Sequence, residues 1–209
     1  MQDLTLGDEI AWLAVRLAGT ASPEARIHCP GETGGSPWVR MRVDDDRLAA
    51  YFRVMDSTLG TWHGNNAYAS CAQAVCGVLA CTVETDIAPW SSEGGASDNE
   101  QAMREWMLAR PALYRHLGPA SLVGGLLPGD VLYMEGHVAI YVGEDMARRR
   151  WPETDGNVFE AAFSAGLYPG VDRYDDLTAH PQFGPVDVIR PVARRKRPRF
   201  PFPDYEALL

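Results

Sequence analysis

Two side chains in this sequence have the types and settings that nucleophilic chemistry requires. Cys71 stands near the start of the apolar segment SCAQAVCGVLAC, and His137 directly follows a glycine in GDVLYMEGHVAIYVG. A thiolate is a strong nucleophile, and an imidazole can accept its proton and later protonate a leaving amine. The alternative for His137 is a core histidine satisfied by a backbone carbonyl, and this stretch alone does not decide between the two.

The other cysteines are expected to have different roles. Cys71, Cys76 and Cys81 recur every five residues, a step that turns a helical side chain by about 140°, so the three cannot share one metal. No CxxC or HxxxH pairing occurs, so the sequence predicts no zinc site. Cys76 and Cys81 lie among valine, leucine and alanine and are expected to be core residues. Cys29, beside His28 in a loop rich in Pro and Gly, is a weaker candidate nucleophile than Cys71.

The pattern around Cys71 predicts a buried helix that begins at this residue. The segment CAQAVCGVLACTV is apolar almost all round, as in a central helix, and Asn65, Asn66 and Ser70 upstream are suitable caps. The N-terminus of a helix lowers the pKa of a cysteine through its N–H groups and its positive dipole end. The sequence therefore predicts a Cys71 thiol that is activated by its position.

The pattern around His137 predicts a strand with two different faces. The branched residues at 138, 140 and 142 share one face, whereas His137 shares the other with the small Ala139. We expect the branched side chains to fill a core. We expect the helix that begins at Cys71 to pack on the face of His137, which would bring the thiol and the imidazole together.

Helical patterns precede strand patterns along the chain. Helices are predicted at the N-terminus (Ile10, Leu13, Ala14 and Leu17 have helical spacing), over 43–60, from Cys71, and over 99–117 with an interruption near Pro111. From Leu126 the runs PGDVLYME, HVAIYVG, NVFEAAF and VDVIRPV predict short strands. This order predicts an α+β fold, with N-terminal helices packed on a small antiparallel sheet.

Length and charge limit the function classes. The 209 residues suffice for one domain with a sizeable core, predicted over 1–209, with 1–45 as an alternative accessory helical lobe and 191–209 as a C-terminal tail. A net charge of −9 disfavours a nucleic-acid partner, and the basic block 194–197 is expected to be solvated. No apolar run approaches the length of a membrane span, and no signal peptide is visible because acids stand where basic residues are needed.

The helix that begins at Cys71 and the later LPGDVLYMEGHVAIYVG resemble the NlpC-type branch of the papain-like cysteine peptidases and, more distantly, the CHAP amidases. In those families a Gly-Asp turn, here Gly129 and Asp130, leads into one strand, and the catalytic histidine, here His137, begins the next. The match covers roughly 61–163, and its histidine motif is more specific than its cysteine motif. The resemblance implies a papain-like core with the nucleophile at a helix N-terminus.

The resemblance also implies a Cys71 nucleophile, a His137 base and a polar residue on the following strand that orients the imidazole. In NVFEAAF this third residue is Glu160, with Asn157 as the alternative. Sequential strands usually pair, and Glu160 lies on the less bulky face of its strand, where His137 is also expected. A half-buried carboxylate there needs a partner; the alternative is a solvated glutamate on an edge strand.

The sequence departs from the family pattern around the nucleophile. The usual Asp-Cys-Ser-Gly is replaced by Ser-Cys-Ala-Gln over 70–73, and the upstream aromatic-Gly-Gly segment is reduced to TWHG. The family's tyrosine, which contributes to the oxyanion site, is not obvious. We expect the backbone N–H of Cys71 and a second donor, His63 or Tyr68, to hold the oxyanion. Further substrate-contacting residues are expected at Trp62, Ser70 and Gln73.

The function implied by this resemblance is hydrolysis of an amide bond without metal or cofactor, in peptidoglycan or a peptide. The bond lies in the stem peptide or between muramic acid and L-alanine, and the sequence does not choose. The localisation stays unknown, although a peptidoglycan substrate would imply an extracytoplasmic one. Two alternatives remain open: a non-catalytic binding protein on the same fold, and a thiol acyltransferase or deamidase that acts on lipid or protein.

Overall fold

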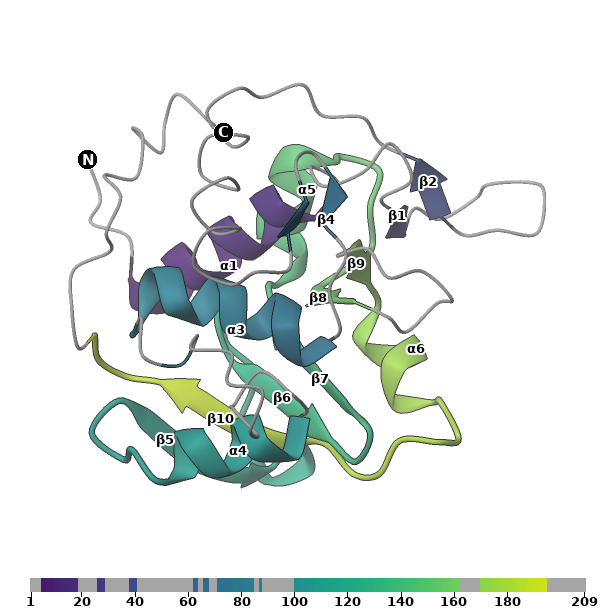
Figure 1. Ribbon diagram of the computed structural model, residues 1–209. Helices are drawn as coiled ribbons and strands as arrows, with labels where there is room; N and C mark the ends of the chain where they lie inside the picture. The colour runs from purple at the N-terminus through teal and green to yellow at the C-terminus, as the bar shows by residue number, and fades with distance from the viewer. Residues whose placement is uncertain are drawn as a thin grey trace.

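The computed structural model describes residues 5–18, 71–84, 87, 100–161 and 170–194, apart from the side chain of Gln73. It also describes the backbone of four short segments, 26–28, 38–40, 62–63 and 66–67. These residues form an α+β fold with an open, mainly antiparallel sheet (Figure 1). In this part of the chain no helix is both long enough and apolar enough to cross a membrane.

The described helices differ widely in length. They are α1 (Leu6–Leu17), α3 (Cys71–Thr82), α4 (Glu100–Leu108), α5 (Glu144–Arg150) and α6 (Tyr174–Thr178), with a 3₁₀ turn η2 (Ala120–Leu122). The start of α1 is well defined by a capping box, in which the Thr5 hydroxyl accepts from the Asp8 N–H and the Asp8 carboxylate accepts from the Thr5 N–H. This cap fixes where the predicted N-terminal helix begins.

Eight described strands make one sheet. They are β1 (Arg26–His28), β2 (Trp38–Arg40), β5 (Tyr114–Pro119), β6 (Val131–Met134), β7 (His137–Tyr141), β8 (Val158–Glu160), β9 (Gly170–Asp172) and β10 (Asp187–Pro191). Their spatial order is β2-β1-β9-β8-β7-β6-β10-β5, and all neighbours are antiparallel except β1 and β9, which are parallel. Two further strands, β3 (Trp62–His63) and β4 (Asn66–Ala67), pair separately.

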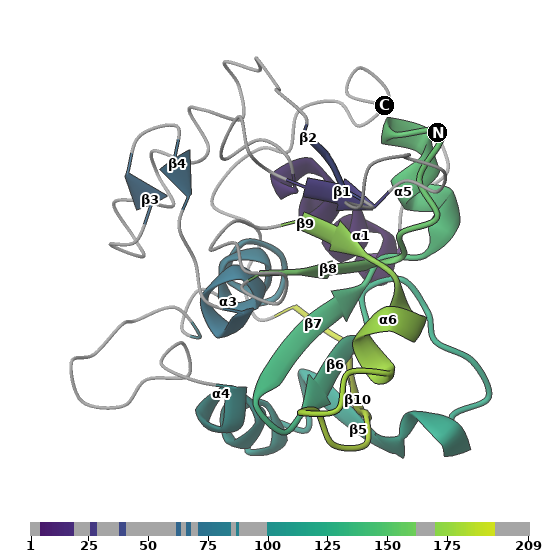
Figure 2. The same cartoon turned by 90° about the vertical axis from the view of Figure 1, so that its right-hand side faces the viewer.

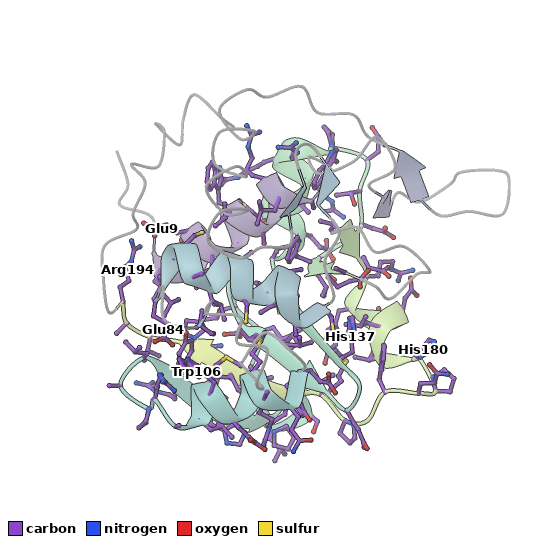
Figure 3. All side chains as sticks on the ribbon, viewed as in Figure 1. Glu9, Glu84, Trp106, His137, His180 and Arg194 are labelled. Carbon is purple, nitrogen blue, oxygen red and sulfur yellow. The ribbon has the colours of Figure 1, made fainter. Side chains whose placement is uncertain are left out.

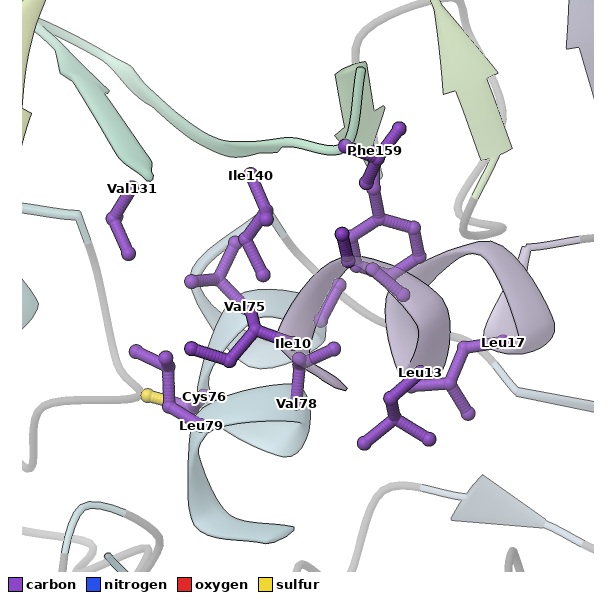
Figure 4. Packing of buried hydrophobic residues seen from close by; sticks show 14 of the residues in the cluster. Ile10, Leu13, Leu17, Val75, Cys76, Val78, Leu79, Val131, Ile140 and Phe159 are labelled. Atoms are coloured by element: carbon purple, nitrogen blue, oxygen red, sulfur yellow. The ribbon is translucent and has the colours of Figure 1, made fainter. Parts of the chain in front are cut away.

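The main core lies between this sheet and helices α1 and α3. Figure 4 shows Ile140 and Phe159 of the sheet above Val75 of α3 and Ile10 of α1, all fully buried. Burying one such side chain contributes about 1.5–3 kcal/mol of transfer free energy. The helix that begins at Cys71 is therefore held against β7 by the branched face of that strand.

The opposite face of the sheet carries a second apolar cluster. Its members include Leu132, Ala139 and Val188 from the strands and Leu177 from α6. Figure 2 shows α3 and α6 on opposite sides of β7. Because side chains alternate along a strand, Ala139 and His137 point to the α6 side and not to the α3 side. The prediction that α3 packs on the face of His137 is wrong. The branched residues of β7 pack on α3, and the segment after β9, residues 173–186, covers the other face.

Most predicted elements are confirmed, with differences at the edges. The four predicted strand runs contain β6, β7, β8 and β10. The predicted helix over 99–117 is only half right, because α4 ends at Leu108 and β5 begins at Tyr114. The sheet is also larger than predicted, since β5, β9, β1 and β2 extend it. The predicted helix over 43–60 lies outside the described residues.

Candidate functional site

Cys71 is the first residue of α3 and is partly buried. Two backbone N–H groups donate hydrogen bonds to its sulfur, those of Val138 in β7 and of Ala72 in α3. The donor from β7 belongs to the residue that directly follows His137. Strand β7 therefore contacts α3 at Cys71. The two elements pack through the branched face of β7, which is not the face that carries His137.

Burial raises the pKa of the Cys71 thiol above its ordinary value. The N–H groups of Val138 and Ala72 act in the opposite direction, whereas the charges of Glu100 and Glu160 raise the pKa further. The predicted activation of Cys71 by the helix N-terminus is therefore wrong for the resting site. The expected N–H groups are present, but the removal of the sulfur from water outweighs them.

His137 and Glu160 lie close together and are almost entirely buried. The Nε2 atom of His137 is 3.6 Å from Oε2 of Glu160, and the two side chains are 3% and 4% exposed. In the register of β7 and β8, Ile140 faces Phe159, so the neighbours Ala139 and Glu160 point to the same face as His137. The register agrees with the predicted shared face. The predicted hydrogen bond stays a prediction, because 3.6 Å exceeds hydrogen-bond length.

Burial is the main cause that lowers the pKa of His137 to about 4, and the nearby His180 lowers it further. A carboxylate favours a protonated imidazole, but Glu160 at 3.6 Å does not offset the removal of the ring from water. The imidazole is therefore neutral near pH 7. A neutral ring can accept a proton, which is the state that a general base needs.

Two aromatic rings from the segment after α6 complete the surroundings of His137. The Phe183 ring stacks on the imidazole with centroids 4.8 Å apart and planes at 13°. The His180 ring lies against the Phe183 ring at 4.8 Å and 37°. Figure 3 shows His137 and His180 at the end of α3 that lies away from Glu84 and Trp106. Sequence reasoning missed Phe183 and His180, whose only signal is two rings within the polar stretch HPQFGP.

The Gly-Asp turn of the resemblance has a structural role in this chain. Gly129 has φ +90°, and a Cβ atom on it would lie 2.6 Å from the Cα of Gly7. The buried Asp130 carboxylate accepts from Nε and Nη2 of Arg190, at 2.6 and 2.8 Å, and from the N–H of Leu127. This turn therefore fixes the start of β6 against α1 and β10, and the β6–β7 hairpin carries His137.

Asn157, the alternative orienting residue, has another function. Its Oδ1 atom accepts from the N–H of Tyr174 at 2.8 Å, at the start of α6. Its backbone carbonyl accepts from Val142 and Gly143. Asn157 therefore connects β8 with β7 and α6, and Glu160 is the carboxylate that faces His137.

The remaining predicted residues divide into core and undescribed positions. Cys76 and Cys81 are buried in the main core, at 0% and 8% exposure, as predicted. Of Trp62 and His63 only the backbone is described, in β3, and the same holds for Asn66 in β4. Outside the description lie Cys29, Asn65, Tyr68, Ser70 and the side chain of Gln73. The predicted oxyanion and substrate roles therefore stay predictions.

Arg194 is the first residue of the predicted solvated basic block. Its guanidinium donates to the carboxylate of Glu9 in α1, so this residue is anchored to the domain. Residues 195–197 of the block lie outside the described residues.

Taken together, the structure gathers Cys71, His137 and Glu160 around the beginning of β7. The catalytic pairing of the Cys71 sulfur with the His137 ring stays a prediction. Within the same described ranges, no group of three or more His, Cys, Asp or Glu side chains is arranged to hold a metal ion. Comparisons of the chain with protein-family models, curated proteins and solved structures found no match.

Proposed function

We propose that this chain is a cysteine hydrolase with a papain-like core that cleaves an amide bond, with Cys71 as nucleophile and His137 as base. One observation carries the proposal: the Cys71 sulfur accepts the N–H of Val138, while the preceding residue, His137, has its ring 3.6 Å from a buried carboxylate. A thiol, an imidazole and a carboxylate in one small region are the parts of a nucleophile, its base and an orienting group.

The resting pair is a neutral thiol and a neutral imidazole, since burial raises the pKa of Cys71 and lowers the pKa of His137 to about 4. The thiol proton must therefore move during the reaction. Because Nε2 of His137 faces Glu160, we assign Nδ1 as the atom that receives this proton. The N–H groups of Val138 and Ala72 stabilise the thiolate that forms.

The reaction then follows two balanced steps. The Cys71 sulfur attacks the amide carbonyl carbon, its proton passes to His137, and the imidazolium protonates the leaving amine as the C–N bond breaks. In the second step His137 takes a proton from water, which attacks the thioester carbonyl. The C–S bond breaks, the Cys71 thiolate regains a proton, and a carboxylic acid is released.

Glu160 has the role of an orienting and stabilising carboxylate. In this role its carboxylate faces Nε2–H of His137 and offsets the positive charge of the imidazolium intermediate. Closing the 3.6 Å separation to hydrogen-bond length when substrate binds strengthens this interaction, since catalytic contacts often tighten only in the complex. The oxyanion of the intermediate is assigned to the Cys71 backbone N–H and a second donor, His63 or Tyr68.

The substrate proposed is peptidoglycan, at the stem peptide or at the bond between muramic acid and L-alanine. The support for this choice is the likeness of the Gly129-Asp130 turn and the His137 strand to NlpC-type sequences. The structure adds that the turn and the strand belong to one hairpin, with β6 and β7 paired from Val131 to Ile140.

Digestion of purified peptidoglycan tests the proposal. The parent protein, Cys71→Ala and the matched control Cys81→Ala are incubated with peptidoglycan, and the soluble products are analysed by mass spectrometry. We expect the parent and Cys81→Ala to release the same fragments, whose masses identify the bond, and Cys71→Ala to release none. Equal release by Cys71→Ala would reject the nucleophile. If the parent releases nothing and binds peptidoglycan without cleavage, the binding-protein alternative replaces the hydrolase.

A further inference from the structure

The face of β7 that carries His137 is covered by the chain that follows β9, and one ring of this segment lies directly on the imidazole. Phe183 stacks on His137 at 4.8 Å between centroids, with the two planes only 13° apart. A near-parallel stack covers one side of the imidazole ring. It is a geometric restraint that neither the nucleophile nor the carboxylate provides.

The position of Phe183 is itself well supported. Its N–H donates to the carbonyl of His180 at 3.1 Å, and the N–H of His180 donates to the carbonyl of Leu177. Leu177 is fully buried in the apolar cluster under the sheet, against which the Phe183 ring also packs. A short chain of contacts therefore ties the ring to the folded body of the protein.

We propose that Phe183 is a positioning residue: its ring holds the His137 imidazole in the plane in which Nε2 faces Glu160, which leaves Nδ1 as the atom assigned to the thiol proton. This inference rests on the proposed function and adds a residue to it. A histidine ring turns freely about its last side-chain torsion unless its surroundings hold it, because that torsion has only broad minima. A misplaced base loses proton transfer even when every reacting group is present.

Several charged or titratable groups also act on His137, and the test must separate them from the Phe183 ring. Glu160 faces it from β8 and His180 acts from the segment after α6, whereas Cys71 of α3 contacts the N–H of the next residue, Val138. Glu135, in the turn before β7, is exposed and lies near Gly184 of the covering segment. A substitution of Phe183 changes none of these charges, so its effects report on the ring.

Three substitutions distinguish a stacked ring from simple filling of space. Phe183→Tyr keeps an aromatic face, Phe183→Leu keeps an apolar side chain without one, and Phe183→Ala removes both. His180→Gln serves as a control, because it removes the neighbouring charge and leaves the Phe183 ring. Thermal unfolding identifies any variant that does not fold. If Phe183→Ala does not fold, the comparison of Phe183→Tyr with Phe183→Leu tests the role of the ring.

The first readout is the NMR titration of the His137 ring in the full chain, assigned by comparison with His137→Gln among the five histidines. Because burial lowers the pKa of His137 to about 4, we expect the parent ring to titrate there. In Phe183→Ala water reaches the ring, and we expect the pKa to rise by about one unit or more towards its ordinary value. Phe183→Tyr is expected to titrate like the parent. A Phe183→Ala ring that titrates like the parent would overturn the proposal.

The second readout is turnover. We expect Phe183→Ala and Phe183→Leu to lower kcat by about 10- to 100-fold with KM little changed, and Phe183→Tyr to keep most of the parent's kcat. Parent-like kcat in Phe183→Leu would overturn the role of the aromatic face. The titration needs no catalysis, so the two proposals can fail separately. If the NMR pattern is found and the parent hydrolyses no amide, the ring contact holds and the hydrolase fails.

Discussion

The Nε2 atom of His137 lies 3.6 Å from Oε2 of Glu160, on the face of β7 opposite to the helix that begins at Cys71. The candidate site therefore lies on both sides of β7, at the first residues of this strand. The sulfur reaches the backbone of β7 through the Val138 N–H, and the carboxylate reaches the His137 ring from β8. Both side chains of the His137–Glu160 pair are buried, so water screens their interaction little.

Replacement of Glu160 by glutamine tests the orienting carboxylate. The amide keeps the shape of the side chain but cannot offset the imidazolium charge, so we expect kcat to fall by about 100-fold or more with the fold intact. The matched control is Glu135→Gln, the same chemical change at an exposed position near the hairpin turn. Unchanged turnover in Glu160→Gln would reduce the machinery to Cys71 and His137.

Alkylation of Cys71 by iodoacetamide reports the state of the thiol. Because burial raises its pKa, we expect slow labelling near pH 7 and a rate that climbs above the ordinary pKa of 9.0. Peptide mapping by mass spectrometry should show modification at Cys71 ahead of the buried Cys76 and Cys81. Full labelling of Cys71 at neutral pH, at the rate of a free thiolate, would contradict the resting neutral thiol.

The buried imidazole should make the free energy of unfolding depend on pH. The folded pKa of His137 is about 4, below its unfolded value near 6.5, so the unfolded state binds the extra proton between these values. The stability that comes from the neutral ring is present above pH 6.5 and is lost progressively as pH falls from 6.5 to 4. We expect the parent to lose about 2–3 kcal/mol more than His137→Gln between about pH 7 and pH 4.5. Urea denaturation measures this difference, and equal losses would contradict the low folded pKa.

A second buried carboxylate, Glu84, should matter for stability alone. Its Oε1 atom accepts from Trp106 Nε1 at 3.1 Å, and its Oε2 atom lies 3.6 Å from Nε of Arg110, whose guanidinium covers the Trp106 ring at 3.5 Å. We expect Glu84→Gln to lower the free energy of unfolding by about 1–3 kcal/mol and to leave Cys71 alkylation unchanged. Glu105→Gln, at an exposed position of α4, is the matched control. A change in alkylation with Glu84→Gln would mean that the two regions are coupled.

The sequence predicted an element correctly where a single helical or strand pattern dominated its segment. The helical spacing of α1 and the β-rich runs of β6, β7, β8 and β10 identified these elements. The face on which α3 packs could not be predicted, because Val138 and Ala139 are both fully buried and alternation does not say which layer covers which face. The edge strand β5 was missed because YRHLGP carries polar and turn residues that only pairing with β10 makes extended.

The sequence predicted only that part of the candidate site which depends on the pairing of consecutive strands. The placement of Glu160 on the face of His137 followed from alternation and from the pairing of consecutive strands. The pKa of Cys71 was predicted in the wrong direction, because burial of a side chain is a tertiary property. The Phe183 contact arises from a segment more than forty residues after His137, and no local pattern connects the two.

Trapping of the acyl-enzyme tests the central claim most directly. A soluble peptidoglycan fragment is mixed with the parent protein, the reaction is quenched with acid in the first turnover, and the protein is analysed by peptide mapping and mass spectrometry. The account predicts an added acyl group on the peptide that contains Cys71, absent from Cys71→Ala and present in Cys81→Ala. Cleavage of the fragment with no acyl group on Cys71, or at the parent's rate in Cys71→Ala, would contradict it.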